Sequence, residues 1–320
     1  MEKKNIVCCC DSNYLQHVAV LLCSMYENNR NLEDVCIHLI TIHVKKEEII
    51  RLDKQLQQYG WFFKQYQIDD IKERIGVEIP PTISIASYIR LFLPSILDIS
   101  IKIVLYLDCD IIINGSILPL FEQELSNYYI AGALDVGTKK SAQKIGLIND
   151  FYYNAGMLLI NLDLWRKEHL QDKCIAFLRE CGGCVYHHDQ GLINRICMGG
   201  KLTVSPEWNV LTAYYDFSYE YLIKYCNTCY SKIEIEKAKG NPLIIHFTPS
   251  LSNRPWMENC NHPYKYLYRQ YQQKTAWRGI PIQKDNRKFR LRFLTFIYHY
   301  FPISLYEFVL KVRSLISNKI

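Results

Sequence analysis

Short apolar runs alternate with helical patterns through the first 68 residues of the chain. Residues 5–10, 35–44 and 61–68 have the length and apolar character of strands. Residues 17–26 and 46–59 lie between them and carry apolar side chains at helical spacing. This alternation predicts an α/β fold: a Rossmann-like mixed, mainly parallel sheet with helices on both faces.

The same rhythm continues to about residue 260 and then fades. Further strands are predicted at 101–107, 129–134 and 243–247, and apolar runs also lie at 111–113 and within 151–162. Helices are predicted at 84–93, where Pro94 should end the helix, and at 165–181. The chain of 320 residues is long enough to bury a sizeable core without disulfides.

Polar residues follow four of the predicted strands: Asp11, the pair Asp108 and Asp110, Asp135, and His246. Ligands of open α/β sheets bind outside the carboxyl ends of the strands. We therefore expect these side chains to gather at one edge of the sheet.

The sequence Asp108-Cys109-Asp110 follows the most hydrophobic predicted strand, residues 101–107. Two buried carboxylates without a cation would be costly. Together they suit Mn²⁺ or Mg²⁺, and His246 could supply a nitrogen ligand that Mn²⁺ tolerates. The alternatives are a solvated turn for the acidic pair and an ordinary core histidine for His246.

Two other polar residues have two interpretations each. Arg90 is either a surface arginine that pairs with Asp53 or Asp98, or it orients a carboxylate of the acidic pair or meets phosphate. Asp189 precedes an apolar helical segment, and alone we would favour a helix N-cap over a functional carboxylate.

The 13 cysteines include two Cys-x-x-Cys pairs, at 181–184 and 226–229. A zinc site is one interpretation, but the gap between the pairs is long, and buried free thiols in a reducing cytosol are the simpler one. No signal peptide or membrane-spanning helix is expected. Motifs for dinucleotide, P-loop and nucleic-acid binding are missing, so no nucleic-acid partner is expected.

Positive charge is concentrated at the C-terminal end. From Lys274 onward there are ten Lys or Arg and two acidic residues, whereas the rest of the chain is nearly neutral. An aromatic run at 293–306 follows the basic residues and contains Pro302. This pattern favours a helical basic tail that attaches to an anionic membrane surface, with packing on the core or on another subunit as the alternative.

Six motifs in order carry a resemblance to a known family. They lie at residues 5–14, 88–91, 105–110, 154–156, 189–190 and 244–247. In this arrangement the chain resembles the family 8 glycosyltransferases, which include bacterial lipopolysaccharide glucosyl- and galactosyltransferases and, more distantly, glycogenins. The likeness runs from about residue 4 to 278.

The resemblance implies a GT-A fold in residues 1–278, with residues 279–320 as the membrane-association or packing segment. It also implies one UDP-sugar site, a divalent metal, and retention of the anomeric configuration. The metal ligands would be Asp108, Asp110 and His246. The implied catalytic residues are Arg90, Asp135, Asp189 and Gln190. The implied nucleotide-sugar-binding residues are Cys9, Asp11, Asn13, Tyr14, Arg90, Asp108, Cys109, Asn154, Ala155, Gly156, Asp189, Gln190, Ser250 and Arg254.

The chain departs from the family pattern in the loop after His246. Arg254 stands where the family commonly has a lysine before Pro-Trp, and Pro249 or Ser250 occupies a region where glycine is usual. Arginine can neutralise a diphosphate, even with two hydrogen bonds, but the two residues are not interchangeable.

The resemblance leads us to expect a cytoplasmic hexosyltransferase, peripheral on the inner face of the membrane. It would move glucose or galactose from a UDP-hexose to a lipopolysaccharide core or another glycan acceptor, free or lipid-linked. Transfer to a protein or to itself, and a non-catalytic assembly role, are the alternatives. For retention we favour front-face attack over a covalent route, which would need a well-placed carboxylate.

Overall fold

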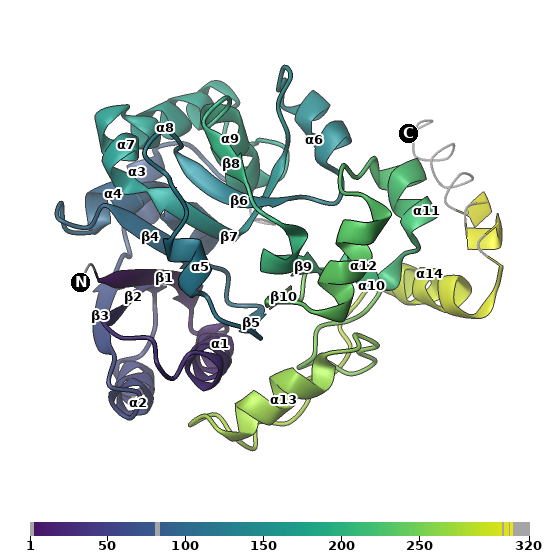
Figure 1. Ribbon diagram of the computed structural model, residues 1–320, viewed down its shortest axis with the longest axis horizontal. Coiled ribbons are helices and arrows are strands. Elements are labelled where there is room, and N and C mark those ends of the chain that lie inside the picture. The colour runs from purple at the N-terminus through teal and green to yellow at the C-terminus, as the bar shows by residue number, and fades with distance from the viewer. Residues whose placement is uncertain (1–2, 81–83, 303, 307, 310–320) are drawn as a thin grey trace.

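The computed structural model describes residues 3–80, 84–302, 304–306, 308 and 309, and these residues form two sheets surrounded by helices (Figure 1). The strand order of the seven-stranded sheet is β3-β2-β1-β4-β7-β6-β8. In that order the strands are Phe62–Gln67, Val35–Ile42, Lys4–Asp11, Ile103–Leu107, Tyr153–Asn161, Ile130–Leu134 and Lys201–Thr203. Only β7 runs antiparallel to its neighbours β4 and β6. The predicted mixed, mainly parallel sheet is confirmed.

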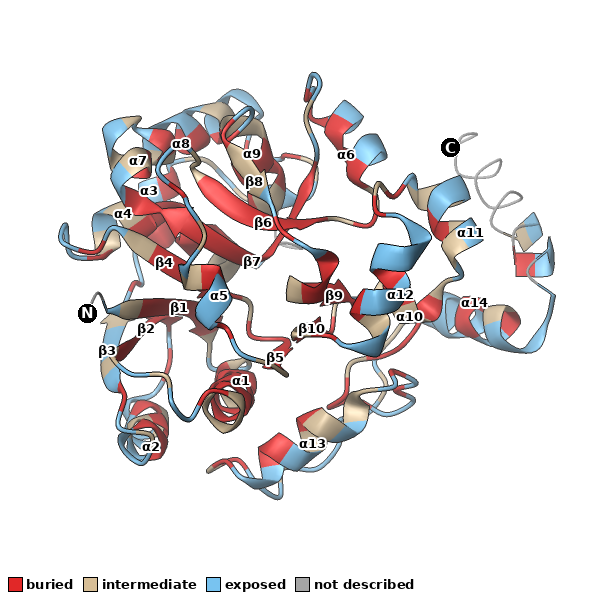
Figure 2. Ribbon diagram, in the orientation of Figure 1, coloured by how far each residue is buried: buried red, intermediate tan, exposed pale blue. Residues whose placement is uncertain are grey.

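Helices cover both faces of this sheet, as predicted (Figure 1). One face packs against α1 (Leu15–Asn28) and α2 (Lys46–Gln57). The other packs against the 3₁₀ helix η1 and against α3, α4, α7, α8 and α9. Their bounds are Ile85–Phe92, Ile71–Ile75, Leu93–Ile96, Leu162–Lys167, Leu170–Glu180 and His188–Ile196. The central strands are almost entirely buried (Figure 2). This double coverage explains why β1 is a continuous apolar run.

A second, three-stranded sheet stands beside the first, in the order β5 (Ile111–Ile113), β10 (Ile244–His246), β9 (Val210–Leu211). In the antiparallel β5·β10 pair His246 lies opposite Ile111, the residue after Asp110. His246 therefore reaches the acidic pair from a different sheet, and not from the edge of the large sheet as expected.

Two helix predictions are wrong in detail. Residues 85–92 form a 3₁₀ helix, and Pro94 lies in the first turn of α4 and does not end a helix. Proline has no N–H to continue a ladder, but its φ suits a first turn. The single helix predicted at 165–181 is instead α7 and α8, because His169 between them adopts a left-handed backbone conformation with φ of 53°.

The remaining helices lie around the second sheet and toward the C-terminal end (Figure 1). They are α5 (Leu118–Phe121), α6 (Thr138–Lys144), η2 (Pro206–Trp208), α10 (Thr212–Asp216), α11 (Tyr219–Tyr221), the π-helix η3 (Leu222–Cys226), α12 (Lys232–Gly240), α13 (Lys265–Gln273) and α14 (Phe289–Tyr300).

The predicted helix in the basic C-terminal segment is present as α14. It buries Leu294 and Ile297 in a small cluster that includes Tyr221, and it exposes Phe289, Phe293 and Tyr300. Figure 2 shows this two-sided character, with buried positions on one side of α14 and exposed positions on the other. Among the helices described, none has the length and apolar character needed to cross a membrane.

Candidate active site

Asp108, Asp110 and His246 converge at the junction of the two sheets. The acidic residues lie in the turn between β4 and β5, and the β5·β10 register brings His246 beside them. Nε2 of His246 lies 3.1 Å from Oδ1 of Asp110 and 3.8 Å from Oδ2 of Asp108. One ligand atom from each residue lies within 4.8 Å of the others. Two carboxylates and one imidazole in this arrangement suit a divalent cation such as Mn²⁺.

Gly156 on β7 makes this convergence sterically possible. A Cβ atom at Gly156 would lie 2.1 Å from Cε1 of His246 and 3.0 Å from Oδ2 of Asp108. The carbonyl oxygen of Gly156 accepts the backbone N–H of Asp108 at 2.7 Å. Any side chain at this position would clash with His246 and Asp108, and this explains the glycine.

A buried chain of side-chain amides orients the imidazole. Asp135 can only accept hydrogen bonds, so Asn154 turns its NH₂ group toward Oδ2 of Asp135, at 3.2 Å. The amide oxygen of Asn154 then accepts from Nδ2 of Asn209 at 2.9 Å. Oδ1 of Asn209 therefore faces Nδ1 of His246, also at 2.9 Å. This contact places a proton on Nδ1, so Nε2 is the ring nitrogen that faces the carboxylates and can bind a cation there.

Sequence reasoning missed Asn209, although it is completely buried. The only local signal is an asparagine between Trp208 and Val210, in an otherwise apolar stretch. That signal alone is weak, because nothing near it in the sequence shows that β9 pairs with the strand of His246.

Arg90 is buried and binds the other side of the acidic pair. Its Nη2 lies 2.8 Å from Oδ1 of Asp108, and its Nε lies 3.0 Å from Oδ2 of Asp189. Burial disfavours the arginine charge, but these carboxylates hold the pKa of Arg90 well above its usual value. The alternative of a surface arginine paired with Asp53 or Asp98 is wrong, whereas the predicted contact with the acidic pair is confirmed.

Asp189 is not the N-cap of α9. It lies within the first turn of the helix, and the N-cap position belongs to His187. Asp189 is buried, and this burial raises the pKa of its carboxyl although Arg90 opposes the shift. Its neighbour Gln190 donates Nε2 to Oδ2 of Asp135 at 2.9 Å and accepts the backbone N–H of Ala155 at 2.9 Å. The cap interpretation is therefore wrong, and both residues belong to the polar network.

Arg254 approaches the acidic pair from the loop that follows β10. Its Nη2 lies 3.2 Å from Oδ2 of Asp110. Burial raises the pKa of Asp110, but His246 and Arg254 outweigh that effect and hold the pKa well below its usual value. The carboxylate is therefore ionised, as a metal ligand must be.

Two hydrogen-bonding groups of the same loop are unsatisfied. Nε of Arg254 and Oγ of Ser250 are buried and have no hydrogen-bond partner within the part of the chain that the structure describes. Buried polar groups are nearly always paired, and Arg254 contacts Asp110, so the unpaired groups of this loop are suited to a polar ligand. An anion such as a diphosphate could accept from both.

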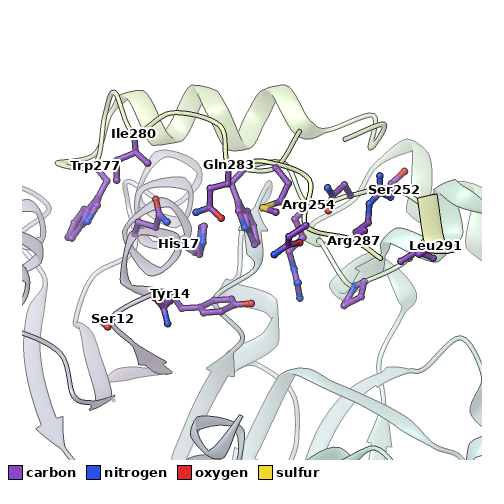
Figure 3. A pocket seen from close by; sticks show the side chains of 18 of the residues that line it. Ser12, Tyr14, His17, Ser252, Arg254, Trp277, Ile280, Gln283, Arg287 and Leu291 are labelled. Carbon is purple, nitrogen blue, oxygen red and sulfur yellow. Dashed lines mark hydrogen bonds between the residues drawn. The ribbon is translucent and has the colours of Figure 1, made fainter. Parts of the chain in front are cut away.

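Two cavities adjoin this cluster. One of about 220 Å³ is lined by Cys9, Asp11, Tyr14, Arg90, Asp108 and Cys109, among others. The other, of about 580 Å³, contains Asn13, Ser250 and Arg254 in its lining. Tyr14 borders both, and Figure 3 shows Tyr14 and Arg254 on the walls of the larger cavity. At the end of β1 the carboxylate of Asp11 accepts the backbone N–H groups of Asn13 and Tyr14, which fixes the turn that presents them.

The structure thus places every donor-binding and catalytic residue expected from the sequence in or beside this one region. Cys9 and Cys109 line the smaller cavity as protonated thiols, because burial raises the pKa of Cys9 to about 12 and that of Cys109 well above its usual value. The zinc interpretation is not supported. Among the described residues the two Cys-x-x-Cys pairs do not converge, and all four thiols are free.

The chain is similar to glycosyltransferases along most of its length. A sequence model described as "Glycosyl transferase family 8" matches residues 5–260. General stress protein A of Bacillus subtilis is 28% identical over 87% of this chain and 96% of its own length. Lipopolysaccharide 1,2-glucosyltransferase of Escherichia coli is 26% identical over 87% of this chain and 80% of its own length.

Lipopolysaccharide 1,3-galactosyltransferase of Salmonella typhimurium is 26% identical and covers 91% of this chain and 84% of its own length. The crystal structure of the galactosyltransferase LgtC with donor and acceptor sugar analogues superposes with a TM-score of 0.72 at 20% identity, covering 87% of this chain and 97% of that one. This likeness shows that the fold is GT-A. The match of the family model over residues 5–260 shows that the chain belongs to glycosyltransferase family 8.

Proposed function

We propose that this protein transfers a hexose, glucose or galactose, from a UDP-sugar to a glycan acceptor with retention of the anomeric configuration, and that it requires Mn²⁺ or Mg²⁺. The observation that supports this best is the convergence of Asp108, Asp110 and His246 beside the unsatisfied donors of Ser250 and Arg254. One side of the site can hold a cation, and the other can hold a diphosphate.

The nucleotide would lie between the end of β1 and the Arg254 loop. Asp11 and Asn13 would bind the uridine, and Tyr14 would stack on the base. A divalent ion held by Asp108, Asp110 and His246 would act as a Lewis acid toward the departing diphosphate. Arg254 and Ser250 would donate hydrogen bonds to the same phosphates, which stabilises the charge that develops on them.

The sugar would face the polar network of Arg90, Asp135, Asn154, Asp189 and Gln190. Neither Asp189 nor Gln190 is free to act as a nucleophile: Arg90 binds the Asp189 carboxylate at 3.0 Å, and both ends of the Gln190 amide are hydrogen-bonded. This engagement favours front-face attack guided by the leaving phosphate. In that route both residues would position the sugar hydroxyls.

For the acceptor we propose a lipopolysaccharide core or another lipid-linked glycan at the inner face of the cytoplasmic membrane. Two relatives carry names of lipopolysaccharide glycosyltransferases. The exposed aromatic side of α14 lies beside Lys288, Arg290 and Arg292, which suits an anionic membrane surface. The protein would then be a peripheral, cytoplasmic enzyme.

The test is slow hydrolysis of a panel of UDP-hexoses by the purified chain. We expect UDP-glucose or UDP-galactose to be hydrolysed with Mn²⁺ and not after removal of the metal by EDTA. Asp110→Asn should lower the rate by at least about a hundredfold, because the side chain keeps its shape but loses the ligand charge. Asp53→Asn, an equivalent change remote from the site, serves as the control.

Each alternative function has its own outcome in this test. Labelled sugar appearing on the polypeptide would show a self-directed transferase and contradict a glycan acceptor. Absence of both hydrolysis and transfer for every UDP-hexose would contradict an enzymatic role and favour a non-catalytic assembly protein.

A further inference from the structure

The loop at residues 248–254, here called the Arg254 loop, carries Arg254 and Ser250 on the side that faces the cavity. Its other side is held by residues from the C-terminal segment. Nη1 of Arg287 donates to the carbonyl oxygen of Leu251 at 2.7 Å, and Oγ1 of Thr295 donates to the same oxygen at 3.4 Å. Figure 3 shows Arg287 on the same wall of the cavity as Ser252 and Arg254.

Arg287 is itself fixed in place. It makes two hydrogen bonds to Asp285, Nε to Oδ1 at 3.0 Å and Nη2 to Oδ2 at 2.8 Å. The two side chains are only 11% and 4% exposed. Because Asp285 neutralises its charge, Arg287 does not supply a free positive charge to the cavity. Its third nitrogen, Nη1, donates to the loop backbone.

The segment that carries Arg287 is anchored to the residues that directly follow the loop. The backbone N–H of Gln283 donates to Trp256 at 2.9 Å, and the carbonyl of Gln283 accepts from Glu258 at 2.8 Å. Within the loop, the backbone N–H of Ser252 donates to the carboxylate of Asp216 at 2.8 Å. Leu251 is therefore held by Arg287, and the next residue, Ser252, is held by Asp216. Both lie between Ser250 and Arg254 in the loop.

We propose that Arg287 is a positioning residue that fixes the Arg254 loop so that Arg254 and Ser250 face a nucleoside diphosphate. This inference rests on the proposed function, because the diphosphate is the ligand that these donors would meet. Without Arg287 the Leu251 carbonyl would lose its closest partner, and the loop would sample conformations in which Arg254 points elsewhere. Binding a diphosphate would then have to order the loop, and the free-energy cost of this ordering would lower the affinity.

The first experiment measures loop order without a ligand, by hydrogen exchange. Arg287→Ala should increase exchange in the peptide that covers residues 249–254 and leave the peptides of β1 and β4 unchanged. Arg278→Ala removes an exposed arginine of the same C-terminal part and should change neither region. Unchanged exchange in the loop of Arg287→Ala would overturn the proposal.

The second experiment measures binding of UDP in the presence of Mn²⁺ by calorimetry. Arg287→Ala should weaken UDP about tenfold in the wild-type background, which is most of what one charge-assisted hydrogen bond contributes. In the Arg254→Ala background it should cause a smaller further loss, because only the Ser250 contact would still depend on Arg287. Equal weakening in both backgrounds would overturn the positioning role.

Two further variants protect the test against a simple folding defect. Arg287→Lys can still donate to Leu251 and should recover most of the affinity, whereas loss of affinity equal to that of Arg287→Ala would contradict the proposal. Thr295→Val keeps the shape and removes the second donor, so a smaller loss in the same direction is expected. If wild-type protein does not bind UDP but exchange in the loop still depends on Arg287, the proposed function fails and the structural role of Arg287 stands.

Discussion

At the scale of single residues, the tautomer and orientation of the His246 imidazole depend on a side chain that is remote in sequence. Asn209 accepts from Nδ1 of His246, and its own NH₂ group is fixed through Asn154 to Asp135. Loss of such a partner typically lowers the affinity of a metal site by about ten- to a hundredfold.

We expect Asn209→Leu, which keeps the branched shape but cannot accept a hydrogen bond, to weaken Mn²⁺ binding about ten- to a hundredfold. Calorimetric titration with Mn²⁺ measures this affinity. Asn29→Leu removes another buried asparagine that is remote from the site and should lower stability without changing metal affinity. Equal Mn²⁺ affinity of Asn209→Leu and wild type would show that the contact does not tune the site.

His262 links stability to pH. It is 1% exposed, and burial lowers the pKa of its imidazole from 6.5 to about 3. Between these two values the unfolded chain binds a proton that the folded chain excludes, so stability is lost as pH falls below about 6.5. One such group contributes a slope of about 1.4 kcal/mol per pH unit.

His262→Asn retains an acceptor for the backbone N–H of Tyr264, which Nδ1 of His262 accepts at 3.2 Å, but it cannot titrate. When urea unfolding is measured between pH 7 and 5, the free energy of unfolding should fall less steeply with decreasing pH for this variant than for wild type. Parallel curves for the two proteins would mean that His262 is protonated in the folded state.

At the scale of elements, α14 has two unlike sides. Leu294 and Ile297 fix it to the body of the protein, whereas Phe289 and Phe293 are 79% and 47% exposed. Both sequence-based interpretations of this segment therefore have a physical basis in the same helix: one side packs, and the other is available to a surface. Membrane attachment itself stays a prediction.

Replacing Phe289 and Phe293 together by Ser should reduce sedimentation of the protein with vesicles that contain an anionic phospholipid, by about tenfold or more, because two large apolar side chains would be lost from the interface. Binding of wild type should also weaken as salt is added. Ile233→Ser removes an exposed apolar side chain from α12 and is the control. Undiminished sedimentation of the double variant would exclude this side of α14 as the anchor.

At the scale of the whole molecule, the C-terminal segment is integrated with the body. Gln283 pairs with residues on either side of Met257, and Arg287 holds Leu251. The division at residue 278 stays a prediction, but these contacts mean that truncation there would remove a wall of the larger cavity. We expect such a truncated chain to bind UDP more weakly, and not only to leave the membrane.

The sequence by itself determined the sheet with two covered faces, and it indicated Asp108, Asp110 and His246 as a candidate metal cluster. Both follow from local pattern: continuous apolar runs mark strands buried on both faces, and Asp108, Asp110 and His246 stand where such runs end. The same local signals failed at Pro94, which lies in the first turn of α4 and does not end a helix, and at His169, whose left-handed backbone divides the predicted helix.

Only the tertiary structure decided how these residues meet. The register of β5 against β10 brings His246 to Asp110, the missing side chain of Gly156 makes room for His246 and Asp108, and Asn209 orients the imidazole. Arg90 and Arg287 likewise acquire their partners from distant segments. Such contacts depend on strand register and packing between segments that can be more than a hundred residues apart, and neighbouring residues in the sequence do not encode them.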